Sequence, residues 1–250
     1  MYADDSTLYM SATAVNTMNA TLNKELQFIS ELPVIYRNCA EIFRSGLTEN
    51  GVHSIRPPNS TRTVKVFCDM KTRGGGWTVL QHRRDGAVDF HRGWRDYKMG
   101  FGDPSGEYWA GNDLIHLLTS SQEYSLQVQL KDDEGNEAYS HYDHFYIEAE
   151  DKNYRYQHGF SGTAGRTSSL TQHGTQFSTK DRDNDRCSCK CAQMSSGGWW
   201  FEACGPSNLN GIYYAGVSNV VRYNGIKWYY WKGASLMATM TTMMVRPAGF

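Results

Sequence analysis

The segment DRDNDRCSCKC, residues 181–191, places alternating aspartates directly before alternating cysteines. Oxygen and sulfur side chains this close together could serve a calcium site, a zinc site, redox chemistry or a disulfide framework. Each of these roles predicts a different kind of protein. An even number of cysteines in a chain rich in tyrosine, tryptophan and glycine indicates an oxidised, secreted domain. The cysteines are Cys39, Cys68, Cys187, Cys189, Cys191 and Cys204.

Calcium fits the spacing of this segment better than zinc does. Zinc sites typically combine ligand pairs from two separate turns, whereas the three cysteines here occupy every second position and no CxxC pairs with them. A redox CxxC is also absent. Calcium takes about six to eight oxygens, and Asp181, Asp183 and Asp185 alternate as an oxygen cage on one chain requires. A solvated acidic turn beside disulfides and a zinc site remain as alternatives.

The cysteine pairing stays open at this point, because six cysteines allow about fifteen arrangements. The simplest arrangement is sequential, and its first and last bridges would each contribute about 3–4 kcal/mol in the chain-entropy model. A bond between Cys187 and Cys189 would close a tight ring, and free thiols at these positions are the alternative.

Composition excludes several function classes. The chain has 250 residues, a formal net charge of −1 and a pI near 6.7, which give no general attraction to nucleic acid or anionic membrane. No stretch approaches the length of a membrane-spanning helix. GxSxG, HExxH and P-loop motifs are absent, so we expect no enzyme and no catalytic residues. Asn59 begins an N-glycosylation sequon, which fits a secreted glycoprotein.

The chain changes character near residue 36. Residues 1–36 lack cysteine, and Leu22, Leu26 and Ile29 have roughly helical spacing before Pro33, which predicts a lone helix or an unstructured tail. Residues 37–250 form the expected domain. Residues 157–212 show no long periodic element, as in a functional or disulfide-held loop region.

Alternating or β-rich runs predict strands, and one apolar run predicts a helix. Asn112 or Asp113 should cap this helix at its N-terminus, and Leu114, Ile115, Leu117 and Leu118 should face inward. The expected strands lie within residues 64–70, 75–83, 124–130, 141–148 and 237–247.

Longer motifs carry a family resemblance. They include RNCAEIFRSG, the run from VFCDM to WAGND, FSTKDRDNDRC, and GGWWFEACGPSNLNGIYY followed by NGIKWYYWKG. Residues 37–250 resemble the fibrinogen C-terminal-like domain and, within that family, the angiopoietins. The resemblance implies an α+β fold with a cysteine-bridged N-terminal subdomain, a central antiparallel sheet and a loop-rich lobe that binds calcium (Ca2+).

The resemblance also implies specific sites. Asp183 and Asp185 would bind calcium together with the backbone carbonyls of Cys187 and Cys189, and the disulfides would pair sequentially. The chain would be a secreted growth-factor ligand domain for a Tie-type receptor tyrosine kinase in angiogenesis. Its receptor-binding residues would be Ser188, Arg222, Tyr223, Lys227, Tyr229 and Tyr230. Exposed tyrosine and arginine suit an interface, whereas Trp228 and Trp231 fit a core.

Two further expectations concern alternatives. A ficolin-type calcium-dependent lectin that recognises acetylated sugars would use the same lobe, but Gly205 occupies the position where such lectins typically have histidine. Residues 1–31 resemble a retrotransposon reverse-transcriptase fragment, because YADD matches the Tyr-x-Asp-Asp motif. Asp4 and Asp5 could not act without a polymerase palm, so we expect an artefact without function. We therefore expect this chain to lack the signal peptide and the oligomerising coiled coil.

Overall fold

The computed structural model describes residues 12–30, 34–158, 161–163, 168–170, 174–214, 222–232 and 238–250. The chain divides into two compact units, Met1–Ile35 and Tyr36–Phe250. The first unit contains helix α1, Ala12–Ser30. Val15, Met18 and Leu22 on this helix are exposed, while the side chains of Leu26 and Ile29 lie outside the described residues.

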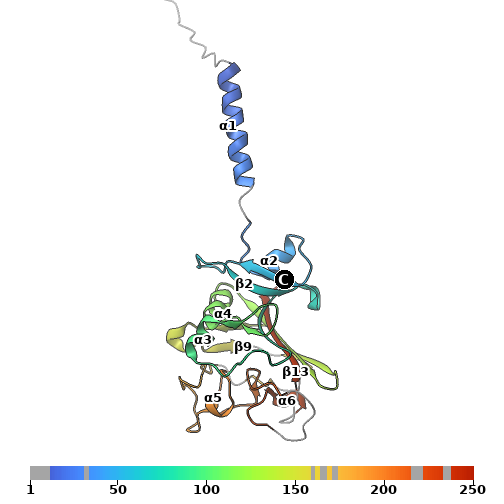
Figure 1. The fold of residues 1–250 in the computed structure, drawn as a ribbon, viewed down its shortest axis with the longest axis vertical. Coiled ribbons are helices and arrows are strands. Elements are labelled where there is room, and N and C mark those ends of the chain that lie inside the picture. The colour runs from blue at the N-terminus through green and yellow to red at the C-terminus, as the bar shows by residue number, and fades with distance from the viewer. Residues whose placement is uncertain are drawn as a thin grey trace, which may run out of the picture. The chain divides into compact units, whose positions relative to one another are not determined.

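The second unit is built on a nine-stranded antiparallel sheet (Figure 1), whose main path runs β1-β2-β3-β13-β6-β7-β10. The C-terminal strand β13 lies in the middle of this path, between β3 and β6. Of two further short strands, β5 pairs with β3 and β4 pairs with β5. The strands are β1 Gly51–Ile55, β2 Val64–Asp69, β3 Trp77–Arg83, β4 Phe101–Gly102, β5 Tyr108–Trp109, β6 Tyr124–Asp132, β7 Glu137–Tyr142, β10 Ser161–Gly162 and β13 Ala238–Pro247.

The β-rich runs in the sequence predicted four of these strands well. The expected runs at 64–70, 75–83, 124–130 and 237–247 correspond to β2, β3, β6 and β13. The single strand expected over 141–148 was wrong, because the chain bends at Asp143 and His144. This bend separates β7 from β8, Phe145–Ile147, which pairs with β9, Tyr156–His158.

Short helices accompany the sheet in this unit. Helix α4 begins at Asn112, after Gly111 at the N-cap, so the expected Asn112 or Asp113 cap was wrong by a residue. Gly111 has φ 102°, a conformation that favours glycine. Leu114, Ile115 and Leu118 are buried as expected, whereas Leu117 is only partly buried. The helices of this unit are α2 Cys39–Arg44, α3 Trp94–Met99, α4 Asn112–Thr119, α5 Cys191–Met194 and α6 Tyr229–Lys232, with single turns η1 Thr72–Gly74 and η2 Glu150–Lys152.

Alternate residues of the central strands supply two apolar clusters. One set of side chains, including Leu126, Val128 and Met243, enters the main core. Trp77, Val79, Tyr108 and Met244 form a smaller cluster of their own. Because side chains alternate between the faces of a sheet, both clusters follow from the period of two in the sequence.

Large aromatic side chains fasten the loop-rich part of the unit to the core. The Trp200 indole N–H donates to the carbonyl of Tyr154 (2.8 Å), and the Trp199 indole donates to the Ser207 hydroxyl (3.0 Å). A Cβ at Gly198 would lie 2.6 Å from the Tyr97 ring, so glycine permits this close approach. In the described residues of 157–212 the longest element is the four-residue α5. Aromatic anchors and disulfides therefore replace regular structure here.

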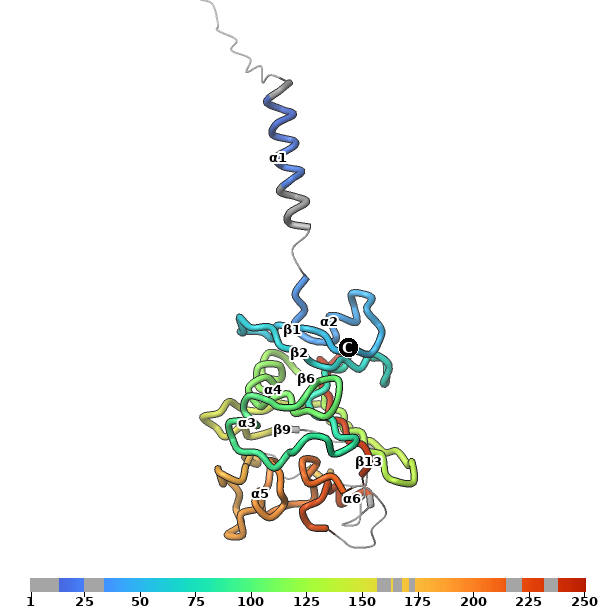
Figure 2. The backbone as a smooth tube through the Cα atoms, viewed as in Figure 1, coloured from blue at the N-terminus to red at the C-terminus, as the bar shows by residue number. Residues whose placement is uncertain are grey.

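The chain ends beside its own N-terminal subdomain. The rings of Phe43 and Phe250 meet edge to face at 5.6 Å, and Figure 1 shows the C-terminus next to α2 and β2. Figure 2 shows α5 and α6 together at the other, loop-rich end of this unit.

Candidate functional site

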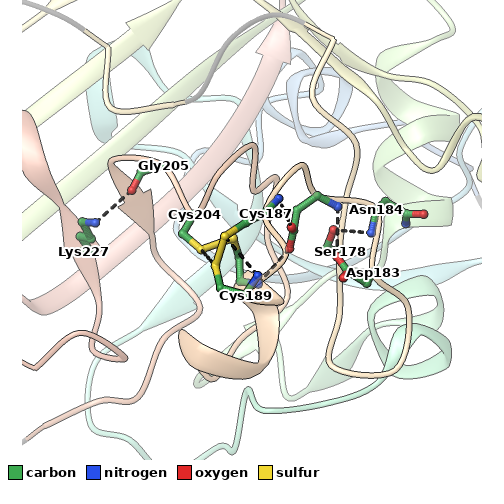
Figure 3. Close-up of a disulfide and its surroundings, with 10 residues drawn as sticks. Ser178, Asp183, Asn184, Cys187, Cys189, Cys204, Gly205 and Lys227 are labelled. Carbon is green, nitrogen blue, oxygen red and sulfur yellow. Dashed lines mark hydrogen bonds between the residues drawn. A yellow bond between two sulfur atoms is a disulfide. The ribbon is translucent and has the colours of Figure 1, made fainter.

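Three disulfides stabilise the second unit. They are Cys39–Cys68, Cys187–Cys189 and Cys191–Cys204, the sequential pairing that the family resemblance implies. The first ties α2 to β2. The other two lie together in the loop-rich region, in contact through Cys189 and Cys204 (Figure 3).

The first aspartate of the acidic segment has a structural role. Asp181 Oδ1 accepts hydrogen bonds from the Trp94 backbone N–H (2.8 Å) and the Thr179 hydroxyl (2.6 Å), and so caps the start of α3. Burial alone would raise the pKa of Asp181, but these two hydrogen bonds hold it below its usual value. Asp181 is therefore committed to α3, which leaves Asp183 and Asp185 as the candidate calcium ligands.

Asp183 and Asp185 lie close together on one side of the loop. Asp183 Oδ1 accepts from the backbone N–H of Asp185 (3.2 Å). The Asp185 carboxylate accepts from the N–H groups of Cys187 (2.8 Å) and Cys191 (2.9 Å). Burial and the neighbouring Asp183 charge raise the pKa of Asp185, although the two backbone N–H groups oppose this. A divalent cation would relieve this repulsion between carboxylates, as calcium sites do.

The cysteines expected to supply carbonyl ligands lie in a constrained turn. A tight turn through Cys187, Ser188 and Cys189 is closed by a disulfide, and the carbonyl of Cys187 accepts a long 3.4 Å hydrogen bond from Lys190. The sulfurs are occupied by disulfides. A zinc site built on these sulfurs therefore does not fit the oxidised chain.

Three tyrosines of the segment 223–230 are exposed. Tyr223 and Tyr229 are each 48% exposed and Tyr230 is 44% exposed, whereas Trp228 is fully buried. Tyr229 and Tyr230 meet edge to face at 5.4 Å. We call these three residues the tyrosine patch.

Backbone hydrogen bonds fix the tyrosine patch to other segments. The Tyr229 N–H donates to the Pro206 carbonyl (2.9 Å), and the Tyr230 N–H donates to the Ser169 hydroxyl (3.0 Å). Behind them, β12, Lys227–Trp228, pairs with β11, Ser207–Asn208. No motif marks Ser169, since it lies far away in the sequence and only the fold brings it to the patch.

The other residues expected at the receptor surface differ in accessibility. Ser188 and Arg222 are exposed, and the Arg222 guanidinium lies 4.3 Å from the Tyr214 ring centre. Lys227 is partly buried, and its Nζ donates to the Gly205 carbonyl (2.9 Å, Figure 3). Burial lowers the pKa of Lys227. Its geometry suits holding loops together more than direct docking.

A continuous set of contacts connects the acidic loop to the tyrosine patch. Asp185 binds the Cys191 N–H, and Cys191 is bonded to Cys204. The next residue, Gly205, accepts the Lys227 ammonium, two residues before Tyr229. The loop and the patch therefore share one disulfide-linked frame.

Comparisons with known proteins agree on one family. The family model for "Fibrinogen beta and gamma chains, C-terminal globular domain" matches residues 35–248. The fibrinogen-like globe domain of human ANGPTL2 superposes with a TM-score of 0.82 and 39% identity, covering 85% of this chain and 99% of that one. Lamprey fibrin D-dimer gives a TM-score of 0.79 and 32% identity, covering 94% and 85%. The chain belongs to the fibrinogen C-terminal domain family.

Within that family the chain is similar to angiopoietins. It is 58% identical to angiopoietin-2 of Canis lupus familiaris over 228 residues, 91% of this chain and 46% of the relative. It is 54% identical to human angiopoietin-2 over 244 residues, which are 97% of this chain and 48% of the relative. It is 56% identical to angiopoietin-1 of Sus scrofa over 216 residues, which are 86% of this chain and 43% of the relative. This is an angiopoietin-like domain, and the chain spans about half the length of these relatives.

The comparisons give no support to the reverse-transcriptase resemblance of residues 1–31. The match to human angiopoietin-2 covers 97% of the chain, and so it reaches into the segment before Tyr36. Among the residues that the structure describes, no helix is long and apolar enough to cross a bilayer.

Proposed function

We propose that the chain is a secreted angiopoietin-like growth-factor ligand domain that binds the ectodomain of a Tie-type receptor tyrosine kinase in vascular signalling. The tyrosine patch is the observation that carries the proposal. Its side chains combine large rigid area with polar hydroxyl groups, as interface hot spots do. Ser188 and Arg222 extend the surface, and Lys227 holds its loops in place.

Calcium belongs to the same proposal. Asp183 and Asp185 would supply carboxylate oxygens, and Cys187 and Cys189 would supply backbone carbonyls. The bound ion would neutralise the acidic pair and stabilise the loop. Cys191 and Cys204 connect this loop to the tyrosine patch. Bound calcium would therefore strengthen receptor binding indirectly, by stabilising the disulfide-linked loops that hold the patch.

The proposed compartment is extracellular. Three disulfides suit an oxidising environment. We also propose that Asn59 is N-glycosylated, because it is exposed in the turn after β1. Secreted protein treated with an amide-cleaving glycosidase should lose mass, and the loss should be absent in Asn59→Gln. The proposed role requires binding and no catalysis.

A ficolin-type lectin is the second candidate. It would bind acetylated sugar near Gly205, but Gly205 offers no side chain and its carbonyl is engaged by Lys227. The high identity to angiopoietins also favours the ligand role. Calcium-dependent retention on an acetylated resin would favour the lectin.

The receptor experiment compares tyrosines on and off the patch. Tyr229→Ala and Tyr230→Ala should each weaken binding to immobilised Tie-type ectodomain by at least about tenfold, because a truncated hot spot costs about 2 kcal/mol or more. Tyr146→Ala is the matched control, since Tyr146 is 38% exposed on β8. Wild-type affinity in both patch variants, with circular dichroism showing intact folding, would reject the assigned interface.

A further inference from the structure

A buried amide on the sheet has a nitrogen without a partner. Leu126 and Val128 of β6 enter the main core, so Gln127 between them faces the other side of the sheet. Gln127 is nevertheless only 1% exposed, and its Oε1 shares a hydrogen bond with His141 Nδ1 (3.1 Å). Its Nε2 is buried and has no hydrogen-bond partner among the residues that the structure describes. Because an unpaired buried donor costs free energy, this nitrogen indicates a position for a bound group.

Gln127 and an arginine line the same hollow, which has a volume of about 150 Å³. The Arg73 guanidinium, in the turn before β3, lies 3.7 Å from the centre of the Tyr139 ring, and both side chains line this hollow. The acidic residue of the lining, Glu137, is paired with Lys131 at 3.2 Å. None of the ion pairs between described residues includes Arg73. Its charge is therefore available to a ligand.

The charges around the hollow favour an anion. Burial lowers the pKa of His141, and the positive charges of Arg73 and Arg246 lower it further, against the opposing charge of Asp143. Because His141 contacts Gln127, the same positive charges act on the hollow. A guanidinium binds a carboxylate through parallel N–H···O hydrogen bonds, and an unpaired amide N–H can donate to the same group.

A second hollow adjoins the first on this face. Gln129 and Met240 line both hollows. The second has a volume of about 220 Å³, and Phe67, Val79 and Tyr108 are among its walls. These apolar side chains suit an alkyl chain.

We propose that the two hollows together bind a monocarboxylic acid with a short alkyl chain. Arg73 and the Gln127 Nε2 bind the carboxylate, and the chain crosses Met240 into the second hollow. None of these residues belongs to the acidic loop or to the tyrosine patch. The site is therefore independent of the proposed receptor surface.

Titration of the full chain with hexanoate tests the proposal by NMR of isotope-labelled methionine methyl groups, with the ionic strength held constant. The Met240 signal, assigned by its loss in Met240→Leu, should shift and saturate. Propionate should bind at least about tenfold more weakly, because each buried methylene changes affinity about fourfold. Equal affinity for the two acids would overturn the proposal. Hexanamide is the neutral probe and should not bind, and its binding more tightly than hexanoate would mean that the Gln127 oxygen faces the hollow, which also would overturn the proposal.

Variants locate the carboxylate. Arg73→Gln should weaken hexanoate binding at least about tenfold, whereas Arg62→Gln should not, since Arg62 is an exposed arginine between β1 and β2 that does not line the hollow. Gln127→Met keeps the length of the side chain and removes the amide, so it should also weaken binding while circular dichroism shows an intact fold. If Gln127→Met does not fold, the exposed Arg73 still decides the matter. Wild-type affinity for hexanoate in Arg73→Gln would overturn the proposal.

Discussion

Glu107 shows how one buried carboxylate organises a loop. Its Oε1 accepts from the backbone N–H groups of Arg84 (2.8 Å), Asp85 (3.1 Å) and Gly86 (3.0 Å), and its Oε2 accepts from Val88 (3.0 Å). Burial alone would raise the pKa of Glu107, but these hydrogen bonds and the nearby Arg83 charge lower it below 4.5. The carboxylate therefore stabilises the fold only while it is ionised.

Glu107→Gln should lower the free energy of unfolding at pH 7 by about 2–4 kcal/mol, because the amide N–H2 faces backbone donors. The pKa of Glu107 is lower in the folded state, so its contribution is complete above about pH 4.5 and falls as pH drops through the folded pKa. The difference in unfolding free energy between wild type and variant should therefore shrink as the pH falls below about 4.5. Urea unfolding of wild type and Glu107→Gln at a series of pH values measures this difference in the free energy of unfolding.

Glu49→Gln provides the surface comparison. Glu49 pairs with Lys71 at 2.7 Å, but its side chain is 83% exposed. This exposed pair should contribute less than about 1 kcal/mol. If Glu107→Gln and Glu49→Gln gave the same small change, the structural role assigned to Glu107 would be wrong.

The acidic loop is the element in which calcium and folding can be separated. Asp183→Asn should abolish the rise in melting temperature on adding calcium, which at 100 times the dissociation constant corresponds to about 2.7 kcal/mol. Asp181→Asn should instead destabilise the calcium-free chain, because it weakens the cap on α3, and should keep the calcium response. Circular dichroism melts with calcium and with a chelator distinguish the two. An unchanged calcium response in Asp183→Asn would remove the metal assignment.

The sequence predicted strands and helices better than it predicted the bends and tertiary contacts between them. The β-rich runs located β2, β3, β6 and β13 because β-branched and aromatic residues favour strands. They could not reveal the bend at Asp143 and His144, since the apolar pattern continues across it. The alternating aspartates looked equivalent, yet Asp181 caps a helix that begins far away in the sequence.

The same limit applies to the candidate site. Tyrosine identity indicated surface function, and the tyrosine patch is exposed. The internal bond of Lys227 to Gly205 and the support of Tyr230 by Ser169 depend on tertiary contacts between segments. The contact between Cys189 and Cys204 also arises only when two loops meet. The local sequence pattern contains no signal for any of these three contacts.

At the scale of the whole molecule, the two units should be separable. We propose that Tyr36–Phe250 folds without the preceding segment, as its own sheet and core indicate. A chain that starts at Tyr36 should keep the melting temperature of the full chain within about 2 °C, corresponding to under about 1 kcal/mol. Tyr36 must be retained, because its carbonyl accepts the Arg56 N–H at 2.8 Å.

Calorimetry measures the melting temperatures of the full chain and of the chain that starts at Tyr36. A chain that starts at Cys39 is the informative comparison, because it lacks the hydrogen bond between Tyr36 and Arg56. Aggregation of the chain that starts at Tyr36 would show that the N-terminal segment is needed for folding.

The position of β13 has a consequence for biosynthesis. Translation makes β13, Ala238–Pro247, after every other described strand of the sheet, yet among the described strands β3 and β6 are linked through it. Until β13 has been made, β3 and β6 have unpaired edges, and such edges favour wrong pairing. A premature stop just before Ala238 would leave both strands without their common neighbour.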